Sequence, residues 1–223
     1  MVRRGASLAI ATLAVAFATL PAHAAGTLKL RVVHCPTTLG VQQPLPPTPR
    51  ALHVVLSSRY ATKLEGYSNG YLTALGPSGW HCRGQVGADG SAVLDVTPGR
   101  SGGSVTQPAI TVQFADTPGV SADIACSVFP AAQQQLPIQP CPTSRPKREL
   151  LLVLASTTLA FDDPPGVRGI GLPSGGSDHA NGIASFVPSS SSSTGYALIE
   201  TCTLAASSNS LCTAILDNVF RAG

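Results

Sequence analysis

Residues 71–98, YLTALGPSGWHCRGQVGADGSAVLDVTP, predict the centre of the fold: a strand, a Gly-Pro turn and a hairpin. The hairpin turn is expected at Asp89-Gly90, because glycine adopts a positive φ at no steric cost and Asp-Gly favours tight hairpins. On the return segment, Leu94 and Val96 repeat with a period of two, which indicates a half-buried strand. The stretch predicts architecture and contains no recognisable catalytic motif.

The regions outside this hairpin predict a mainly β protein. Residues 59–70, which include Tyr60 and Tyr67, read as a polar connection. Ser210 is expected to cap a C-terminal helix whose apolar residues repeat at helical spacing. The run 149–161 has the length of a helix, but its β-branched threonines favour one buried strand. Strands are expected at residues 28–34, 52–57, 108–114, 122–129, 149–161, 182–187 and 196–203.

The fold class expected is an antiparallel β-sandwich-like domain with a short C-terminal helix. An alternative is a small two-lobed β domain, with lobes at 25–132 and 148–223. The segment between them, around residues 133–147, is rich in proline and glutamine, which indicates a loop or linker. A faint internal similarity between residues 50–58 and 148–157 leaves duplication of a β unit open.

The N-terminal residues 1–24 have the pattern of a secretory signal peptide. Arg3 and Arg4 precede an apolar run at 8–20, and Ala22-His23-Ala24 fits a signal-peptidase site. The run is shorter than the roughly 20 residues of a transmembrane helix. The ordinary secretory route is favoured over twin-arginine export, because the rest of that motif is missing. We therefore expect a secreted, extracellular chain that begins at Ala25.

The charge of the mature chain argues against nucleic-acid binding. Two of the 14 basic residues lie in the leader, which leaves 12 against 11 acidic residues. Charged residues make up 11% of the chain, against a typical 25%. Nucleic-acid binding requires clustered lysine and arginine. A folded, loop-rich and weakly charged protein is expected.

Six cysteines in an exported chain predict three disulfides. Local pairing favours Cys126 with Cys141 and Cys202 with Cys212, which leaves Cys35 for Cys82, one of 15 connectivities. Trp80, the only tryptophan, is expected to anchor the core on the same strand as Cys82.

The cysteine arrangement also places two histidines together. The dipeptides His34-Cys35 and His81-Cys82 would bring both imidazoles to one face if the cysteines pair. Two ligands are too few for a metal site, so surface histidines are the favoured interpretation.

Three further patterns have a chemical alternative. His81-Cys82 with Ser174-Gly175-Gly176 resembles trypsin-like serine proteases, with Asp95 or Asp116 as the acid, but Pro173 and Leu172 depart from that motif. The acidic segment 162–166 is read as a strand end, not a calcium loop. The aromatic residues Tyr60, Tyr67, Tyr71 and Trp80 are candidates for a sugar-binding platform, although a core role is favoured.

Several short motifs are spread over most of the mature chain: GPSGWHC at 76–82, GADG at 87–90, DPPGV at 163–167, TCTL at 201–204 and LC at 211–212. They resemble motifs of uncharacterised disulfide-containing secreted proteins of high-GC bacteria. The resemblance implies export and a similar fold, and it implies no activity.

The function expected is that of an exported, non-catalytic binding or interaction protein with no cofactor and no metal. Its partner would be a cell-envelope polymer or protein. Loops on a rigid scaffold are where recognition residues usually lie, so Tyr60, Tyr67 and residues 166–193 are the candidate binding regions. The alternative is a small secreted serine hydrolase that uses Ser174.

Overall fold

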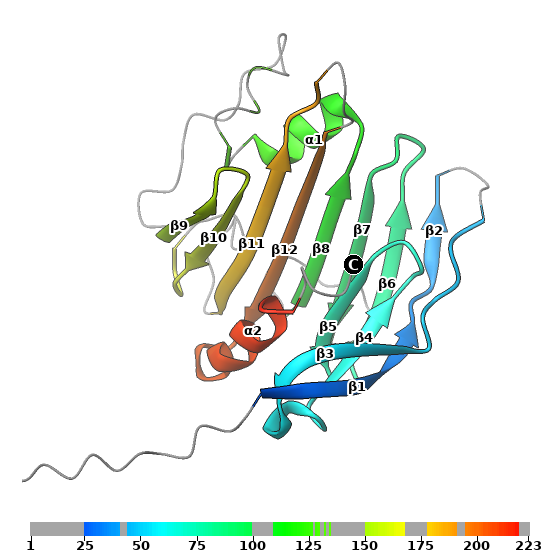
Figure 1. Ribbon diagram of the computed structural model, residues 1–223, viewed down its shortest axis with the longest axis vertical. Coiled ribbons are helices and arrows are strands. Elements are labelled where there is room, and N and C mark those ends of the chain that lie inside the picture. The colour runs from blue at the N-terminus through cyan, green and yellow to red at the C-terminus, as the bar shows by residue number, and fades with distance from the viewer. Residues whose placement is uncertain are drawn as a thin grey trace, which may run out of the picture.

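The computed structural model describes residues 25–40, 44–99, 109–126, 128–129, 132, 134, 150–167, 178–190 and 195–218. It contains two β-sheets and a short C-terminal helix, in a sandwich-like arrangement (Figure 1). The predicted mainly β fold class is confirmed. Within the described part of the chain, no helix is long and apolar enough to cross a membrane.

Within the described ranges, the larger sheet has eight strands and contains the predicted hairpin. All neighbouring strands are antiparallel except the first pair, which is parallel. Gly90 has a φ of +82°, so the Asp89-Gly90 turn forms as expected. The strand order is β2 (Thr37–Leu39), β6 (His81–Val86), β7 (Ala92–Thr97), β8 (Ala109–Ala115), β12 (Tyr196–Leu204), β11 (His179–Val187), β10 (Thr158–Asp163) and β9 (Leu150–Ala155).

The smaller sheet has four strands among the described residues and contacts the larger one through its last strand. β5 packs against β7 and β8, so the two sheets share one apolar core. β1 and β4 are parallel, whereas the other two pairs are antiparallel. The strand order is β3 (Ala51–Ser57), β1 (Ala25–His34), β4 (Leu64–Ser68) and β5 (Thr73–Pro77).

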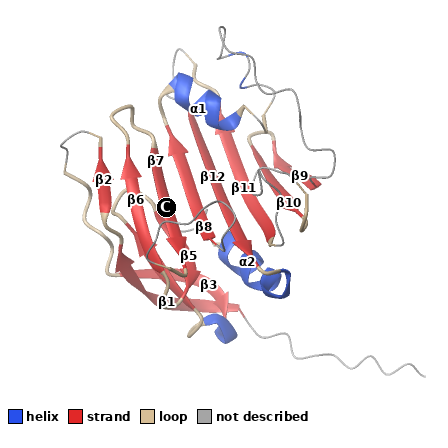
Figure 2. Cartoon of the chain, turned by 180° about the vertical axis from the view of Figure 1, so that it is seen from behind, coloured by secondary structure: helices blue, strands red, loops and turns tan. Residues whose placement is uncertain are grey.

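The two faces of the large sheet are covered by different elements. Along β12, Ala197 and Ile199 belong to the cluster under α1 (Pro118–Ala125). Cys202 and Leu204 point to the other face and join the cluster with the small sheet and α2 (Asn209–Leu216). The two helices lie near opposite ends of the strands (Figure 2). Because β12 is covered on both faces, buried residues occur in succession along it and do not strictly alternate with exposed ones.

Residues 122–129 do not form the predicted strand. Their first half lies in α1, which begins at Pro118, where the fixed φ of proline suits a first helical turn. Ser121, Ala122 and Ala125 are buried against the sheet at helical spacing. Small residues allow the helix to approach β8, β11 and β12 closely, so packing decides between the two local structures.

Residues 149–161 do not form one strand either. They contain β9, a turn and the beginning of β10, which pair with a bulge between Thr158 and Leu159. Because the chain folds back, the backbone N–H and C=O groups of the two segments form hydrogen bonds with one another. One long strand at the end of the sheet would lack these partners. β10 ends at Asp163, as expected from the prolines that follow.

The other differences from the predicted elements are small. Residues 59–70 are not a polar connection, because they contain the 3₁₀ turn η1 (Ser58–Tyr60) and β4. α2 follows Ser208, so Ser210 is not its N-terminal cap. Val219 and Phe220 lie outside the described residues, and so does most of 133–147. The suggested lobes are joined through the pairing of β8 with β12.

Candidate functional site

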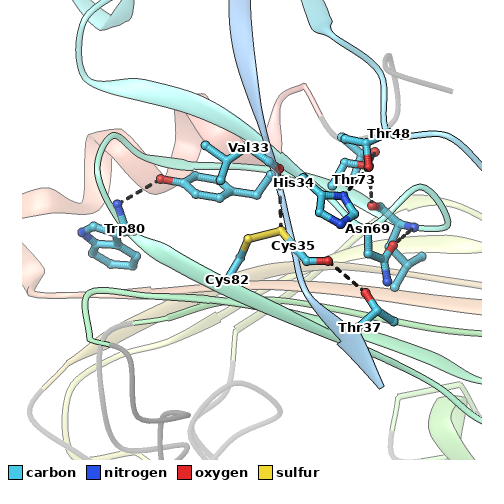
Figure 3. Close-up of a disulfide and its surroundings, with 12 residues drawn as sticks. Val33, His34, Cys35, Thr37, Thr48, Asn69, Thr73, Trp80 and Cys82 are labelled. Atoms are coloured by element: carbon cyan, nitrogen blue, oxygen red, sulfur yellow. Dashed lines mark hydrogen bonds between the residues drawn. A yellow bond between two sulfur atoms is a disulfide. The ribbon is translucent and has the colours of Figure 1, made fainter. Parts of the chain in front are cut away.

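Two disulfides connect elements that meet in the core. Cys35 pairs with Cys82, which links the end of β1 in the small sheet to β6 in the large one (Figure 3). Cys202 pairs with Cys212, which fixes α2 on β12. Both predicted pairings are confirmed, with Cα–Cα distances of 5.2 and 5.5 Å. Cys126 is also disulfide-bonded, but Cys141 lies outside the described residues.

Tyr67 is part of the core and not of an exposed recognition loop. It lies on β4 with no exposed surface, and its hydroxyl donates to the Pro77 carbonyl at 2.6 Å. The same oxygen accepts the backbone N–H of Trp80 at 3.0 Å. Burial, aided by the negative charge of Glu65, raises the pKa of Tyr67 to about 12. Trp80 itself is half-buried in the turn before β6, so its predicted place on the strand is wrong.

Tyr60 is 7% exposed, and its buried ring contacts a cation at the surface. Arg59 lies over the ring, with its guanidinium carbon 4.6 Å from the ring centre, and donates to the Tyr60 hydroxyl at 2.7 Å. That hydroxyl donates in turn to the Ser210 carbonyl at 3.1 Å. The favoured core role of Tyr60 and Tyr67 is confirmed, because η1 and β4 turn both rings toward the core, and neither ring lies in an exposed recognition loop.

The two histidines beside the first disulfide are exposed, as expected. His34 shares a hydrogen bond of 2.7 Å with Thr48, and Figure 3 shows this pair on the opposite side of the disulfide from Trp80. His81 begins β6 and is also exposed. In the described ranges, no three His, Cys, Asp or Glu side chains are grouped as a metal site would require.

The residues suggested for hydrolysis are only partly described. Ser174 lies outside the described residues, so the hydrolase interpretation stays a prediction. Asp95 accepts a hydrogen bond from Thr111 at 3.1 Å and lies 3.6 Å from Arg83. Asp162, from the acidic segment read as a strand end, pairs with His179 on β11.

A cavity of about 330 Å³ lies between the end of β3, η1 and α2. Val55, Leu56 and Ala214 give it apolar walls, while Arg59 and Asp217 bring one positive and one negative charge to it. Tyr60 is among its lining residues, whereas Tyr67 is not. No local sequence pattern indicates this site, because its walls come from residues 55–60 and 210–218, which are far apart in the sequence.

The outer edge of β9 is the most apolar exposed feature of the described chain. Leu152, Val153 and Leu154 are exposed by 63, 72 and 53%, and among the described residues β9 pairs only with β10. A groove of about 360 Å³ begins at Leu154 and continues between β10, β11 and α2. The expectation of a buried strand is wrong for these residues, because they are exposed at the end of the sheet.

No protein-family model, no curated protein and no solved structure matches this chain.

Proposed function

We propose that the chain is an exported, non-catalytic interaction protein that binds a protein of the cell envelope along β9. Export is supported by the signal-like residues 1–24 and by disulfides, which form and persist in oxidising compartments. The apolar edge of β9 supports the binding role.

The single observation behind the proposal is the exposure of Leu152, Val153 and Leu154 on an edge strand. Soluble proteins usually protect such edges with charges, prolines or covering elements. β9 has no charged residue and no proline among Leu150–Ala155. An exposed apolar patch of this kind marks an interaction site.

The chemistry of the edge specifies the kind of partner. An extended segment that adds a strand would pair with the N–H and C=O groups of β9 that have no partner among the described residues. Its side chains should be uncharged, because they would meet Leu152 and Leu154 on one face of the sheet and Val153 on the other. A protein strand meets these requirements better than a cell-wall polymer does.

The proposal is tested by placing a charge on the edge. Val153→Lys should keep the fold, because the side chain is 72% exposed and lysine is common on natural edge strands. Tagged wild-type and variant proteins are incubated with envelope fractions of the producing cell, and captured proteins are quantified by mass spectrometry. We expect one envelope protein to be enriched by wild type and at least tenfold less by Val153→Lys.

Thr38→Lys is the matched control, because Thr38 is exposed on β2 at the opposite edge of the same sheet. It should capture the partner as wild type does. Equal capture by Val153→Lys would contradict the proposal. So would the absence of any envelope partner together with turnover of an ester or peptide that is lost in Ser174→Ala.

A further inference from the structure

The cavity between β3, η1 and α2 is held in shape by contacts at both of its walls. The Asn218 side chain accepts the backbone N–H of Val55 at 3.1 Å and donates to the Ala214 carbonyl at 3.0 Å, which joins β3 to α2. The Tyr60 hydroxyl joins η1 to Ser210 at the other end of the same helix. The cavity is therefore formed before any ligand arrives, and its volume is at the small end of ligand pockets.

The positive charge at this cavity has a fixed orientation. Arg59 is stacked on the Tyr60 ring and donates one N–H to its hydroxyl. A guanidinium has five N–H donors in a planar fork, so most of them remain for a ligand. Among the described residues, Arg59 forms no ion pair. A stacked guanidinium of this kind matches the geometry of a carboxylate.

The negative charge comes from the other wall. Asp217 follows the last residue of α2, is exposed, and forms no ion pair with any described residue. It also lies too far from Arg59 to form an ion pair with it. Ser57 lines the same cavity, and its buried hydroxyl lacks a hydrogen-bond partner within the described chain.

We propose that this cavity binds a small zwitterion of the amino-acid class, with its carboxylate on Arg59 and its ammonium on Asp217. A ligand with both charges would satisfy both groups, whereas a simple anion or cation would satisfy only one. The carbon chain of the ligand would lie against Val55 and Ala214. The lining of the cavity includes no residue of β9, although Thr213 and Asp217 also line the groove that begins at Leu154.

The test uses unbranched amino acids of increasing length. Glycine, 4-aminobutyrate and 6-aminohexanoate are titrated into the mature protein, and binding is followed by two-dimensional NMR. Butyrate and butylamine at the same concentrations are the single-charge probes. We expect one of the zwitterions to shift the backbone signals of residues 55–60 and 213–218 with a lower Kd than either single-charge probe.

Variants of Arg59 and Asp217 test whether these residues bind the carboxylate and the ammonium of the ligand. Arg59→Gln and Asp217→Asn should each raise the Kd of that zwitterion at least fivefold, and both should fold, because the two side chains are at the surface. Arg59→Lys should recover part of the loss, since it keeps the charge without the planar fork. Arg83→Gln, which removes an exposed arginine of β6 outside the cavity, should leave the Kd unchanged.

The inference is overturned if none of the three zwitterions binds, if a single-charge probe binds as tightly, or if Arg59→Gln and Asp217→Asn leave the Kd unchanged. None of these results depends on β9. Failure of this inference is therefore distinguishable from failure of the proposed function.

Discussion

Glu200 is fully buried on β12, and its two carboxylate oxygens have no hydrogen-bond partner within the described chain. Its neighbours across the sheet are Val112 on β8 and Ile183 on β11, which are both apolar. Burial raises the pKa of Glu200 well above its ordinary value of 4.5. The folded protein therefore keeps this carboxyl protonated at pH values where the unfolded chain releases the proton.

The first prediction follows from that difference. As pH rises above 4.5, this group should lower the free energy of unfolding by up to about 1.4 kcal/mol per pH unit, until the raised pKa is passed. Glu200→Gln should remove this slope and stabilise the protein at pH 7. Urea unfolding of both proteins from pH 4.5 to pH 8, with the disulfides intact, measures how the free energy of unfolding changes with pH. An unchanged slope in the variant would refute the prediction.

Glu65 serves as a control, because its pKa is shifted in the opposite direction to that of Glu200. Burial acts to raise its pKa, but hydrogen bonds from Arg31 at 2.6 Å and from the Gly79 N–H at 3.3 Å lower it overall. The stabilisation from a lowered pKa is present above 4.5 and is lost in acid. Glu65→Gln should therefore destabilise the protein at pH 7 and have less effect at low pH.

A second prediction at the residue scale concerns Gly182 on β11. It lies directly opposite Phe161 on β10, and a Cβ at Gly182 would come within 2.0 Å of the phenyl ring. Gly182→Ala should displace the ring and lower the free energy of unfolding by about 1–3 kcal/mol. Gly26→Ala on β1 is the matched control, because nothing lies within 4 Å of a Cβ there. Chemical denaturation of both variants measures the loss in the free energy of unfolding. Equal losses in the two variants would refute the argument.

At the scale of elements, the two disulfides should contribute unequally. Cys35–Cys82 spans a separation of 47 residues and Cys202–Cys212 a separation of 10. Loop-closure entropy of the unfolded chain then predicts contributions of about 4 and 3 kcal/mol. Replacing both cysteines of each pair by alanine should lower the thermal midpoint more for the first pair. The reverse order would show that packing of α2 on β12 outweighs the entropic effect.

For the whole molecule, the signal-peptide prediction and the structure are compatible. β1 begins at Ala25, which pairs with Ser57 on β3, so cleavage after Ala24 would leave the strand complete. We expect N-terminal sequencing of the secreted protein to begin at Ala25. A mature protein that keeps residues 8–20 would indicate a membrane anchor instead.

Local patterns were sufficient for the mainly β class, for most strands and for the β6–β7 hairpin. These features depend on short-range properties: the period of two in Leu94 and Val96, and the positive φ of Gly90. The pairings of Cys35 with Cys82 and of Cys202 with Cys212 also followed from local arguments, because nearby cysteines left few partners for the others.

Tertiary structure alone decided where each apolar segment is placed. α1 is a helix because its small residues fit against β8, β11 and β12, and the β9 run is exposed because it is the last strand of the sheet. Tyr67 is buried because β4 lies inside the small sheet. The cavity of Arg59 and Asp217 joins residues 55–60 to residues 210–218, which are far apart in the sequence. Burial depends on which surfaces meet, and no local pattern contains that information.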